Sequence, residues 1–487
     1  VFYQIFPDRF CEGIENKPMP FPDRLYQADK HAEPFWQPNE TGSHLNEDYF
    51  GGDLEGIRIK LPYLREMGVD YLYLNPIFEA HSNHRYNTAD YLNVDPLLGT
   101  NEEFEVLCRE AAKYGIGIVL DGVFSHTGSD SRYFNREGRY GEGGAYRDPN
   151  SPYRSWYDFD SKYKGGYRSW WGFETLPEVN EETPSYVDFI TGEGGVIDTW
   201  LRRGAAGFRL DVADELPDEF IEKVRTAVKR VGPDKFLLGE VWEDATTKFG
   251  FDKRRTYLLG KGLDSVMNYP FKNAVLGFVC GRDAGQTMTD ILSICEHYPA
   301  PALDTALNFL STHDTERALT VIADEPANGR GREWQSGRCV TGDAYEEGML
   351  KLRMAYAIIY TLPGVPCLYY GDEIGMQGYR DPFNRGFYCW DSHEERLKPV
   401  LAQLAQLRHT CEAFRTGELR VLRAEGGVLH YQRIGEFEAA EIIVNRTEHI
   451  IVEPLASGKH TEVNPMGFTI VVEEVGHNPN HSYYDYK

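Results

Sequence analysis

The sequence predicts an α/β protein: a (β/α)8 TIM barrel with an inserted domain after its third strand and a C-terminal antiparallel β-sandwich. Three observations support this fold class. Eight short apolar runs alternate with amphipathic stretches through most of the 487 residues, a segment rich in Tyr, Trp and Gly breaks that rhythm after the third run, and alternating short strands return near the end. A doubly wound open sheet is the alternative, but no glycine fingerprint of that fold follows a predicted strand.

The eight apolar runs are rich in β-branched and aromatic residues, which favour strands. Between them, stretches such as Leu54, Ile57, Leu61 and Leu64 repeat apolar residues at three- and four-residue steps, which predicts covering helices. Parallel strands need such crossover helices, and eight strand–helix units close into a barrel. The predicted strands are Val1–Phe6, Tyr71–Asn75, Ile116–Asp121, Gly207–Asp211, Phe236–Glu240, Ser265–Asn268, Leu307–Ser311 and Val365–Tyr370.

The predicted domain organisation divides the chain into a barrel and two additions. The barrel occupies residues 1–124 and 181–415, and the inserted domain occupies residues 125–180. Residues 416–487 are predicted to form the C-terminal β-sandwich. This last prediction depends on three alternating runs, which are Val428–Ile434, Glu441–Asn445 and Phe468–Val472.

Composition excludes several classes of function. The chain has 51 basic and 76 acidic residues, and the resulting formal charge of −25 repels nucleic acid and anionic membranes but not neutral ligands. No apolar run reaches the 18 or so residues that would predict a membrane span. The eight cysteines include no Cys-x2-Cys pair, which argues against a zinc site or a disulfide framework and favours a reducing compartment. With no signal peptide before Val1, we expect a cytoplasmic protein.

Candidate catalytic residues lie at the C-terminal ends of the predicted strands, where the side chains of a barrel converge. A single aspartate after a strand is usually a helix cap or a turn former. Four carboxylates that end four strands, with two histidines and one arginine beside them, instead predict one catalytic cluster. These residues are Asp121 and His126 after the third strand, Arg209 and Asp211 on the fourth, Glu240 on the fifth, and His313 and Asp314 after the seventh.

This cluster indicates glycosidic bond cleavage rather than metal chemistry. The histidines follow different strands and no His-x3-His pair accompanies them, so a catalytic metal is not predicted. Paired carboxylates suit a glycosidase because a protonated one releases the leaving oxygen while an ionised one attacks the anomeric carbon. Arg209 lies two residues before Asp211 and on the same strand face, so we expect its charge to lower the pKa of Asp211 and keep it ionised.

A set of short motifs runs along the chain in a fixed order. The main segments are Asp121-Gly-Val-Phe-Ser-His126, Gly207-Phe-Arg-Leu-Asp-Val-Ala213, Gly239-Glu-Val-Trp242 and Ser311-Thr-His-Asp-Thr-Glu-Arg317, accompanied by Gly51-Gly-Asp-Leu-Glu-Gly56, His84-Arg-Tyr-Asn-Thr-Ala-Asp90, Leu176-Pro-Glu-Val-Asn180 and Gly364-Val-Pro-Cys-Leu-Tyr-Tyr-Gly-Asp-Glu373. Over essentially the whole chain this set resembles the α-amylase family of glycoside hydrolases. The first ten residues and the Thr-Glu-Arg after Asp314 are similar to the neopullulanase, cyclomaltodextrinase and maltogenic amylase group.

The resemblance implies a retaining mechanism and a role for each matched residue. Asp211 is the implied nucleophile, Glu240 the general acid/base, and Asp314 the residue that stabilises the distorted transition state. The implied substrate-binding residues are Tyr86, which stacks under the reacting sugar; His126, Arg209 and His313, which bind its hydroxyls; Asp121, which anchors the set; Asp381 and Arg385, which clamp the next sugar on the non-reducing side; and Trp242, which stacks on the acceptor side.

The aromatic residues of the inserted segment allow two interpretations. Most of them are predicted to form the core of that domain, and a sugar-stacking wall is the alternative for some. They are Tyr153, Trp156, Tyr157, Trp170 and Trp171.

Several positions depart from the pattern of the family. Asp214-Glu215 stands where the group usually has Asn-Glu, and Ser125 stands where other α-amylases have a calcium-binding Asn. The loop of residues 11–16 only partly resembles a calcium loop of the group, although Gly51 and Asp53 match its distal half. We therefore predict that no cofactor is required, and a structural calcium near Gly51 and Asp53 stays open.

The implied substrate is an α-glucan or maltooligosaccharide, cleaved at α-1,4 bonds with some transglycosylation, and α-1,6 bonds, pullulan and cyclodextrins are further candidates. A glucanotransferase or glucosyl isomerase of the same fold is the nearest alternative, since a sugar hydroxyl can intercept the covalent intermediate. A non-catalytic amylase-like binding protein is the alternative from another class. The extra N-terminal domain of the group is not part of this sequence, so we expect a monomer.

Overall fold

The structure is a computed structural model that describes residues 1–475 except 15–16, 18–21, 23 and 39–45. Within these residues, eight parallel strands form one sheet in the order β12-β9-β8-β7-β4-β1-β14-β13. A parallel bridge between Met267 and Leu307 joins the two ends of this order and closes the barrel. The predicted (β/α)8 barrel is thus confirmed. Its strands are β1 (Phe2–Ile5), β4 (Tyr71–Leu74), β7 (Gly117–Gly122), β8 (Gly207–Leu210), β9 (Phe236–Gly239), β12 (Ser265–Val266), β13 (Leu307–Asn308) and β14 (Val365–Tyr369).

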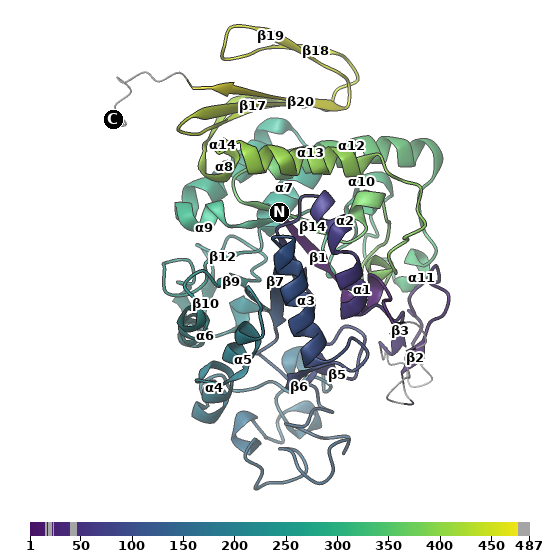
Figure 1. The fold of residues 1–487 in the computed structure, drawn as a ribbon, viewed down its shortest axis with the longest axis vertical. Helices are drawn as coiled ribbons and strands as arrows, with labels where there is room; N and C mark the ends of the chain where they lie inside the picture. The colour runs from purple at the N-terminus through teal and green to yellow at the C-terminus, as the bar shows by residue number, and fades with distance from the viewer. Residues whose placement is uncertain (15–16, 18–21, 23, 39–45, 476–487) are drawn as a thin grey trace.

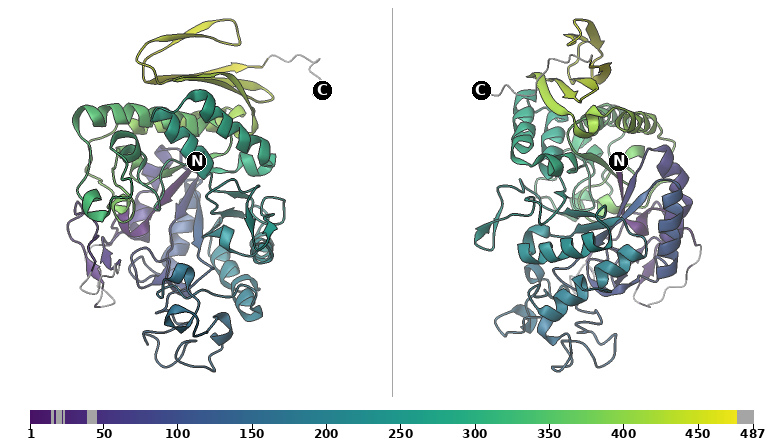
Figure 2. Two further views of the ribbon diagram at one scale, coloured as in Figure 1. Left: turned by 180° about the vertical axis from the view of Figure 1, so that it is seen from behind. Right: turned by 60° about the vertical axis from the view of Figure 1, so that its left-hand side comes forward.

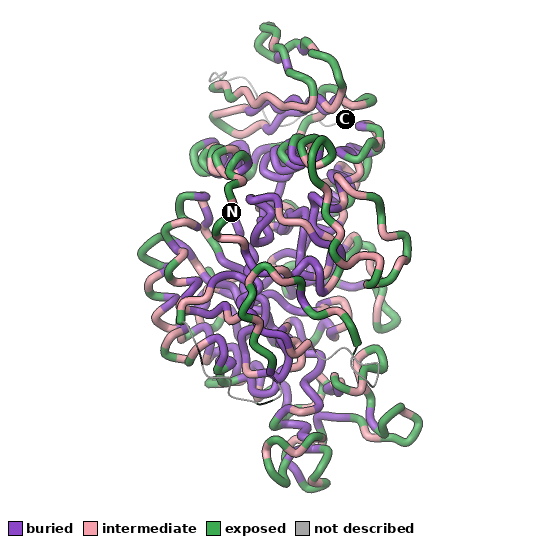
Figure 3. The backbone as a smooth tube through the Cα atoms, turned by 90° about the vertical axis from the view of Figure 1, so that its right-hand side faces the viewer, coloured by how far each residue is buried: buried purple, intermediate pink, exposed green. Residues whose placement is uncertain are grey.

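Successive strand residues alternate between the barrel interior and the surrounding helices, because side chains in a strand point to opposite faces in turn. Phe2, Tyr73 and Leu238 belong to a buried cluster in the interior. Their neighbours Tyr3 and Leu72 belong to the larger cluster that packs against the helices. Figure 3 shows the buried segments concentrated in the middle of the molecule, with exposed segments at its two ends.

The helices begin and end where their sequences supply caps and breakers. At the start of α3, the Thr100 side chain accepts a hydrogen bond from the Glu103 backbone N–H, and the Glu103 side chain accepts one from the Thr100 backbone N–H, which forms a capping box. Asp53 caps α1 in the same position. Within the described residues the helices are α1 (Leu54–Ile59), α2 (Leu61–Glu66), α3 (Asn101–Lys113), α4 (Pro184–Thr191), α5 (Val196–Arg202), α6 (Asp218–Val231), α7 (Tyr269–Val279), α8 (Ala284–His297), α9 (Ala300–Asp304), α10 (Ala318–Ala323), α11 (Arg332–Gln335), α12 (Gly342–Thr361), α13 (Leu397–Thr410) and α14 (Ala413–Thr416).

The inserted segment lies between β7 and β8 and forms one end of the molecule in Figure 1. It contains the short 3-10 turns η2 (Arg154–Trp156), η3 (Lys164–Gly166) and η4 (Trp170–Gly172). Trp156 and Tyr157 are buried there, as the core interpretation requires, whereas Trp171 is 78% exposed. Short strand pairs elsewhere are β2 (Leu25–Tyr26) with β3 (Asp48–Tyr49), β5 (Phe78–Ala80) with β6 (Thr88–Val94), and β10 (Phe249–Gly250) with β11 (Lys253–Arg254).

The C-terminal domain lies at the opposite end, as the two views of Figure 2 show. An antiparallel sheet in the order β15-β16-β17-β20 faces a hairpin of β18 and β19, and Ile443, Leu455 and Val463 pack between them. This sheet also contacts α12, where the hydroxyls of Thr361 and Tyr431 lie 2.6 Å apart. The strands are β15 (Glu418–Glu425), β16 (Val428–Ile434), β17 (Glu438–Asn445), β18 (Ile451–Pro454), β19 (His460–Val463) and β20 (Gly467–Glu474).

We keep the domain boundaries at 124/125, 180/181 and 415/416 as our proposal for dividing the chain. Residues 476–487 of the proposed C-terminal domain lie outside the described residues. No helix among the described residues has the length and apolar character needed to cross a membrane.

Candidate active site

One arginine connects three of the four predicted carboxylates. Arg209 lies on β8, between β7 and β9, and its side chain is fully buried. Its Nη1 lies 2.8 Å from Asp121 Oδ1 and 2.9 Å from Asp211 Oδ1, and its Nη2 lies 2.7 Å from Glu240 Oε2. Because neighbouring parallel strands end side by side, residues from three strands meet at one guanidinium. The predicted convergence of Asp121, Arg209, Asp211 and Glu240 is therefore present in the structure.

Glu240 has two further donors beside Arg209. The backbone N–H of Val212 donates to Glu240 Oε2 at 2.9 Å, and the indole N–H of Trp242 donates to Oε1 at 3.0 Å. Val212 has φ 41, a left-handed conformation that is uncommon for a β-branched residue. The Trp242 ring is 43% exposed and stacks on Tyr269 with centroids 4.2 Å apart. Trp242 thus presents an open aromatic face beside Glu240.

Tyr86, His313 and Asp121 form a second connected group. The Tyr86 hydroxyl donates to Asp121 Oδ2 at 2.7 Å and lies 2.6 Å from His313 Nε2. The rings of Tyr86 and His313 stack with an interplanar angle of 7°. His126 Nε2 lies 3.0 Å from the Tyr86 carbonyl oxygen, and His313 Nε2 lies 3.1 Å from Asp314 Oδ2. These contacts join the residues after β7 to those after β13.

Asp381 and Arg385 pair as expected. Their closest atoms, Oδ1 and Nη1, lie 2.9 Å apart, and Arg385 Nη2 lies 3.6 Å from Asp314 Oδ1. Arg385 Nε donates to the His313 carbonyl oxygen at 3.0 Å. Arg385 is buried, with 7% of its surface exposed, whereas the Asp381 side chain is 34% exposed.

The electrostatics of Asp211 differ from the sequence expectation. Burial raises the pKa of Asp211 well above that of an exposed aspartate, and Glu240, Asp121 and Asp314 raise it as well. Arg209 does lower this pKa, as expected, but its effect is outweighed. The expectation of a lowered pKa was wrong because sequence spacing shows the nearby cation and not the burial.

Burial is also the main cause of the pKa shifts of Asp314, His126 and His313. Burial and then the charge of Glu240 raise the pKa of Asp314 to about 7, against the opposing effect of Arg385. Burial lowers the pKa of His126 to about 4, and the pKa of His313 also falls well below its ordinary value. Both imidazoles are therefore neutral at pH 7 and can exchange hydrogen bonds with a neutral ligand.

The region around Gly51 and Asp53 does not fit a calcium ion. Lys17 pairs with Asp53 Oδ2, and its Nζ donates to the carbonyl oxygens of Gly51 at 2.9 Å and Leu97 at 3.0 Å. Backbone N–H groups of Gly13 and Ile14 donate to the two Asp53 oxygens at 3.1 and 3.0 Å. An ammonium group thus binds the oxygens that a cation would need. Residues 15 and 16 of the loop that resembles a calcium loop lie outside the described residues.

Sequence reasoning missed residues that support the site. Gln4 Nε2 lies 3.0 Å from His313 Nδ1, and Asn75 Nδ2 donates to the Tyr86 hydroxyl at 2.9 Å. His84 stacks on Tyr86 with ring centroids 6.0 Å apart. Gln4 lies on β1 and Asn75 directly follows β4. A polar residue near the end of an apolar strand is the pattern that identified the carboxylates, and the same pattern could have identified these two residues.

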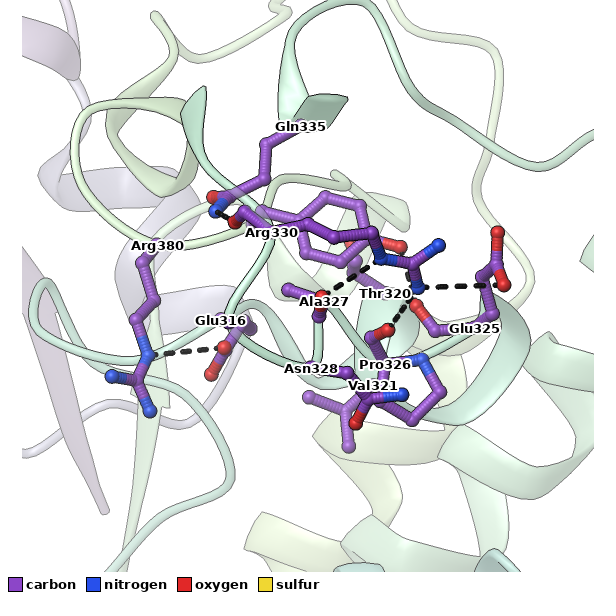
Figure 4. A pocket seen from close by; sticks show the side chains of 12 residues that line it. Glu316, Thr320, Val321, Glu325, Pro326, Ala327, Asn328, Arg330, Gln335 and Arg380 are labelled. Carbon is purple, nitrogen blue, oxygen red and sulfur yellow. Dashed lines mark hydrogen bonds and ion pairs between the residues drawn. The ribbon is translucent and has the colours of Figure 1, made fainter. Parts of the chain in front are cut away.

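A cavity of about 550 Å³ lies among the segments that follow β13 and β14. Its wall includes Glu316, two residues after Asp314, and Arg380, directly before Asp381. These two residues form an ion pair in which Arg380 Nε and Glu316 Oε1 lie 3.0 Å apart (Figure 4). Arg330 Nε donates to the Ala327 carbonyl oxygen at 2.8 Å. None of the predicted catalytic or substrate-binding residues lines this cavity, so it does not contain the catalytic cluster.

The strand ends of this barrel bring three carboxylates onto one buried arginine, an arrangement that suits the paired carboxyl groups of a glycosidase. The chain belongs to the alpha-amylase family, because the alpha amylase catalytic domain matches residues 4–416. A cyclomaltodextrinase of Geobacillus thermopakistaniensis is 32% identical over 467 residues, which cover 93% of this chain and 70% of that protein. The resemblance to the cyclomaltodextrinase and neopullulanase group is confirmed.

Two further similarities are to a much longer protein and to a solved structure of nearly the same length. An amylopullulanase of Thermoanaerobacterium saccharolyticum is 35% identical over 471 residues, which cover 88% of this chain but only 35% of that protein. This chain therefore spans about a third of the length of that relative. The solved structure of a cyclic alpha-maltosyl-(1→6)-maltose hydrolase from Arthrobacter globiformis is similar with a TM-score of 0.80 and 29% identity, over 98% of each chain.

Proposed function

We propose that this chain is a retaining glycoside hydrolase that cleaves α-1,4-glucosidic bonds in maltooligosaccharides, starch or related α-glucans. The observation that carries this proposal is the contact of one guanidinium, Arg209, with both Asp211 and Glu240. Two carboxyl groups bound to one cation lie close enough to act on the same glycosidic bond from two sides.

In the proposed first step, the Asp211 carboxylate attacks the anomeric carbon while Glu240 gives its proton to the leaving oxygen. The glycosidic bond breaks and a covalent glycosyl ester on Asp211 forms. In the second step Glu240 takes a proton from water, the water oxygen displaces Asp211, and the product keeps its α configuration. Asp314 stabilises the distorted transition state, and Tyr86, His126 and His313 hold the reacting sugar.

The flanking residues receive the sugars on either side. Asp381 and Arg385 are proposed to clamp the next sugar on the non-reducing side, and the open face of Trp242 is proposed to stack on the acceptor side. The names of the relatives support α-glucan substrates in general, including pullulan, cyclodextrins and α-1,6-linked sugars. Transglycosylation follows if a sugar hydroxyl replaces water in the second step.

Two alternatives predict other outcomes with the same substrate. A glucanotransferase or isomerase of this fold gives longer or rearranged chains, and a non-catalytic binding protein gives no product. Incubation with maltoheptaose followed by product chromatography separates all three, with Asp211→Asn as the control for contaminating activity. Shorter maltooligosaccharides as the main products, absent with Asp211→Asn, support the proposal. Longer or rearranged chains as the main products support the transferase or isomerase, and an unchanged substrate supports the binding protein.

A further inference from the structure

A chain of buried hydrogen bonds connects the first strand of the barrel to Asp121. Gln4 Nε2 donates to Asn75 Oδ1 at 3.0 Å and also lies 3.0 Å from His313 Nδ1. The Tyr86 hydroxyl lies 2.6 Å from His313 Nε2 and accepts a hydrogen bond from Asn75 Nδ2 at 2.9 Å. The same hydroxyl donates to Asp121 Oδ2 at 2.7 Å. Gln4, Asn75 and His313 are each 1% exposed, so solvent has little access to these bonds.

Asp121 sets the direction of these hydrogen bonds. Burial raises the pKa of Asp121, but Arg209 opposes this shift, and its Nη1 donates to Asp121 Oδ1 at 2.8 Å. A carboxylate that is ionised by such a partner only accepts hydrogen bonds, so the Tyr86 hydroxyl gives it its single proton. The Tyr86 oxygen must then accept from Asn75 Nδ2 and from His313 Nε2. Because the imidazole of His313 is neutral at pH 7, its one proton lies on Nε2.

Gln4 contacts the other nitrogen of this imidazole. An amide nitrogen has two protons and does not accept, so Gln4 Nε2 donates to both Asn75 Oδ1 and His313 Nδ1. His313 Nδ1 is then the unprotonated nitrogen, which agrees with the proton on Nε2. Turning over the amide of Gln4 would place its oxygen against Asn75 Oδ1, and turning over that of Asn75 would place two N–H donors together. One pattern of donors and acceptors therefore fits the whole chain of bonds.

The backbone of β1 holds Gln4 in place. Gln4 pairs in register with Tyr369 of β14 and with Tyr73 of β4, so hydrogen-bonded strands flank it on both sides. The side chain therefore starts from a fixed point, and Asn75 restrains its amide at the other end. The N–H of Gln4 is thus preorganised toward His313 before any substrate binds.

The protonated nitrogen of His313 faces other residues of the active site. Nε2 lies 3.1 Å from Asp314 Oδ2 as well as 2.6 Å from the Tyr86 hydroxyl. With the proton on Nε2, His313 is a donor toward both groups and toward a sugar hydroxyl in the site. With the proton on Nδ1, a lone pair would face the Asp314 carboxylate, and the Tyr86 proton would be drawn from Asp121 to Nε2. The position of one proton thus decides whether His313 gives or receives hydrogen bonds in the site.

We propose that Gln4 is a positioning residue of the active site, which holds His313 as the Nε2–H tautomer by donating to Nδ1. The tautomer of a neutral histidine is set by the hydrogen bond at its other nitrogen, so a donor at Nδ1 is sufficient for this role. Gln4 acts through His313 and not on the sugar itself, and Asn75 supports it by fixing the direction of its amide. The consequence for a sugar rests on the proposed function, whereas the tautomer of His313 does not.

Nitrogen NMR reads this tautomer without any substrate. In the chain labelled with ¹⁵N-histidine, the His313 signals, assigned by their loss in His313→Asn, should show a protonated Nε2 and an unprotonated Nδ1 at pH 7. Gln4→Met keeps a side chain of similar length without an N–H, so both tautomers should be populated. Gln4→Glu offers Nδ1 an acceptor in place of a donor and should bring a proton to Nδ1. A protonated Nδ1 in the unaltered chain, or an unchanged Nε2–H tautomer in both variants, would overturn the proposal.

Kinetics show whether Gln4 acts through His313. We expect Gln4→Met to lower kcat/KM for maltoheptaose by about 3–10-fold, the range for one neutral hydrogen bond. Added to His313→Asn, Gln4→Met should cause little further loss, because its effect passes through an imidazole that is already absent. Gln432→Met is the matched control, since Gln432 is a buried strand glutamine of the C-terminal domain and should leave kcat/KM unchanged when replaced. Fully additive losses from Gln4→Met and His313→Asn would contradict a role through His313.

Two results separate this proposal from the proposed function. An Nε2–H tautomer that depends on Gln4, in a chain that hydrolyses no α-glucan, would contradict the hydrolase and keep the role of Gln4. Hydrolysis by a chain whose His313 tautomer is independent of Gln4 would contradict that role alone.

Discussion

Arg209 and Glu240 form an ion pair in which Nη2 and Oε2 lie 2.7 Å apart, although the same guanidinium also binds Asp211 and Asp121. The three carboxylates come from three neighbouring strands, and Arg209 is the cation that all of them share. The burial of so many like charges is stable only with that cation in place, because an unpaired buried carboxylate loses its hydration without compensation.

Arg209→Ala should therefore destabilise the fold as well as abolish activity. We expect the free energy of unfolding at pH 7 to fall by about 3–5 kcal/mol, since one substitution leaves buried carboxylates without their partner. Denaturant unfolding measures this loss. The control is Arg58→Ala, which breaks a partly exposed pair with Glu55 and should cost about 1 kcal/mol or less. A similar small loss for both variants would show that Arg209 is not the cation that stabilises the cluster.

Asp314→Asn tests the raised pKa of about 7. A carboxyl group whose folded-state pKa is raised binds its proton more tightly in the folded protein, so its contribution to stability is present at acidic pH and is lost as pH rises towards 7. Asparagine removes this ionisation. We expect the Tm of Asp314→Asn to exceed that of the unaltered chain at pH 8 and the two values to approach each other as the pH falls to about 4, the ordinary pKa of an aspartate. A Tm difference that is independent of pH would contradict the shift.

The positions of the catalytic residues along the sequence predicted which of them meet, but not how deeply they are buried. The two-residue spacing of Arg209 and Asp211 predicted their contact, because side chains two residues apart in extended chain point to the same face, and Asp211 directly follows β8. The strand-end positions of Glu240 and Asp314 predicted their convergence. The sequence could not show how deeply Asp211 is buried, and the direction of its pKa was accordingly wrong.

Loop contacts were also beyond the sequence patterns. The pairing of Lys17 with Asp53 joins two loops that no periodicity in the sequence relates. The sequence therefore could not show that the Lys17 ammonium group binds Asp53, where a calcium ion had been left open. Likewise, nothing in the spacing of Trp170, Trp171 and Glu215 shows that Glu215 accepts hydrogen bonds from both indoles.

Lys17→Ala tests whether the Lys17 ammonium group stabilises the fold by binding Asp53 in place of a metal ion. The variant leaves the Asp53 carboxylate and two carbonyl oxygens without a charged donor, and we expect a loss of roughly 1.5–3 kcal/mol in unfolding free energy. Treatment of the unaltered chain with a chelator should change neither its Tm nor its activity. A calcium-reversible fall in Tm on chelation would contradict this account.

Asp381→Ala tests the proposed sugar clamp. Asp381 is preferable to Arg385 as a target because Arg385 also binds the His313 carbonyl oxygen, so its loss would mix stability with affinity. We expect kcat/KM for maltotriose and longer substrates to fall about 10–100-fold, which corresponds to roughly 1.5–3 kcal/mol for a lost charged hydrogen bond. Hydrolysis of α-glucosyl fluoride, which occupies only the reacting subsite, should be nearly unaffected. Asp290→Ala, which breaks a surface pair with Arg282, is the control.

The roles of Asp211 and Glu240 are separated by their own variants. Asp211→Asn should lower kcat by roughly 10⁴-fold or more on every substrate, because the attacking carboxylate is lost. Glu240→Gln should lower kcat on maltoheptaose by about 10²–10⁴-fold but spare the first step with α-maltosyl fluoride, since fluoride leaves without an acid. Equal losses of Glu240→Gln on both substrates would contradict its role as the acid.

The most direct test of the proposed mechanism is to trap the covalent intermediate and identify the residue that carries it. Glu240→Gln should accumulate the glycosyl ester during reaction with a slow fluorosugar fluoride, because the second step lacks its base. Mass spectrometry of the intact chain and of its peptides locates the attached sugar. The account predicts one sugar on Asp211 that is absent from the Asp211→Asn, Glu240→Gln double variant, and a sugar on any other residue would contradict it.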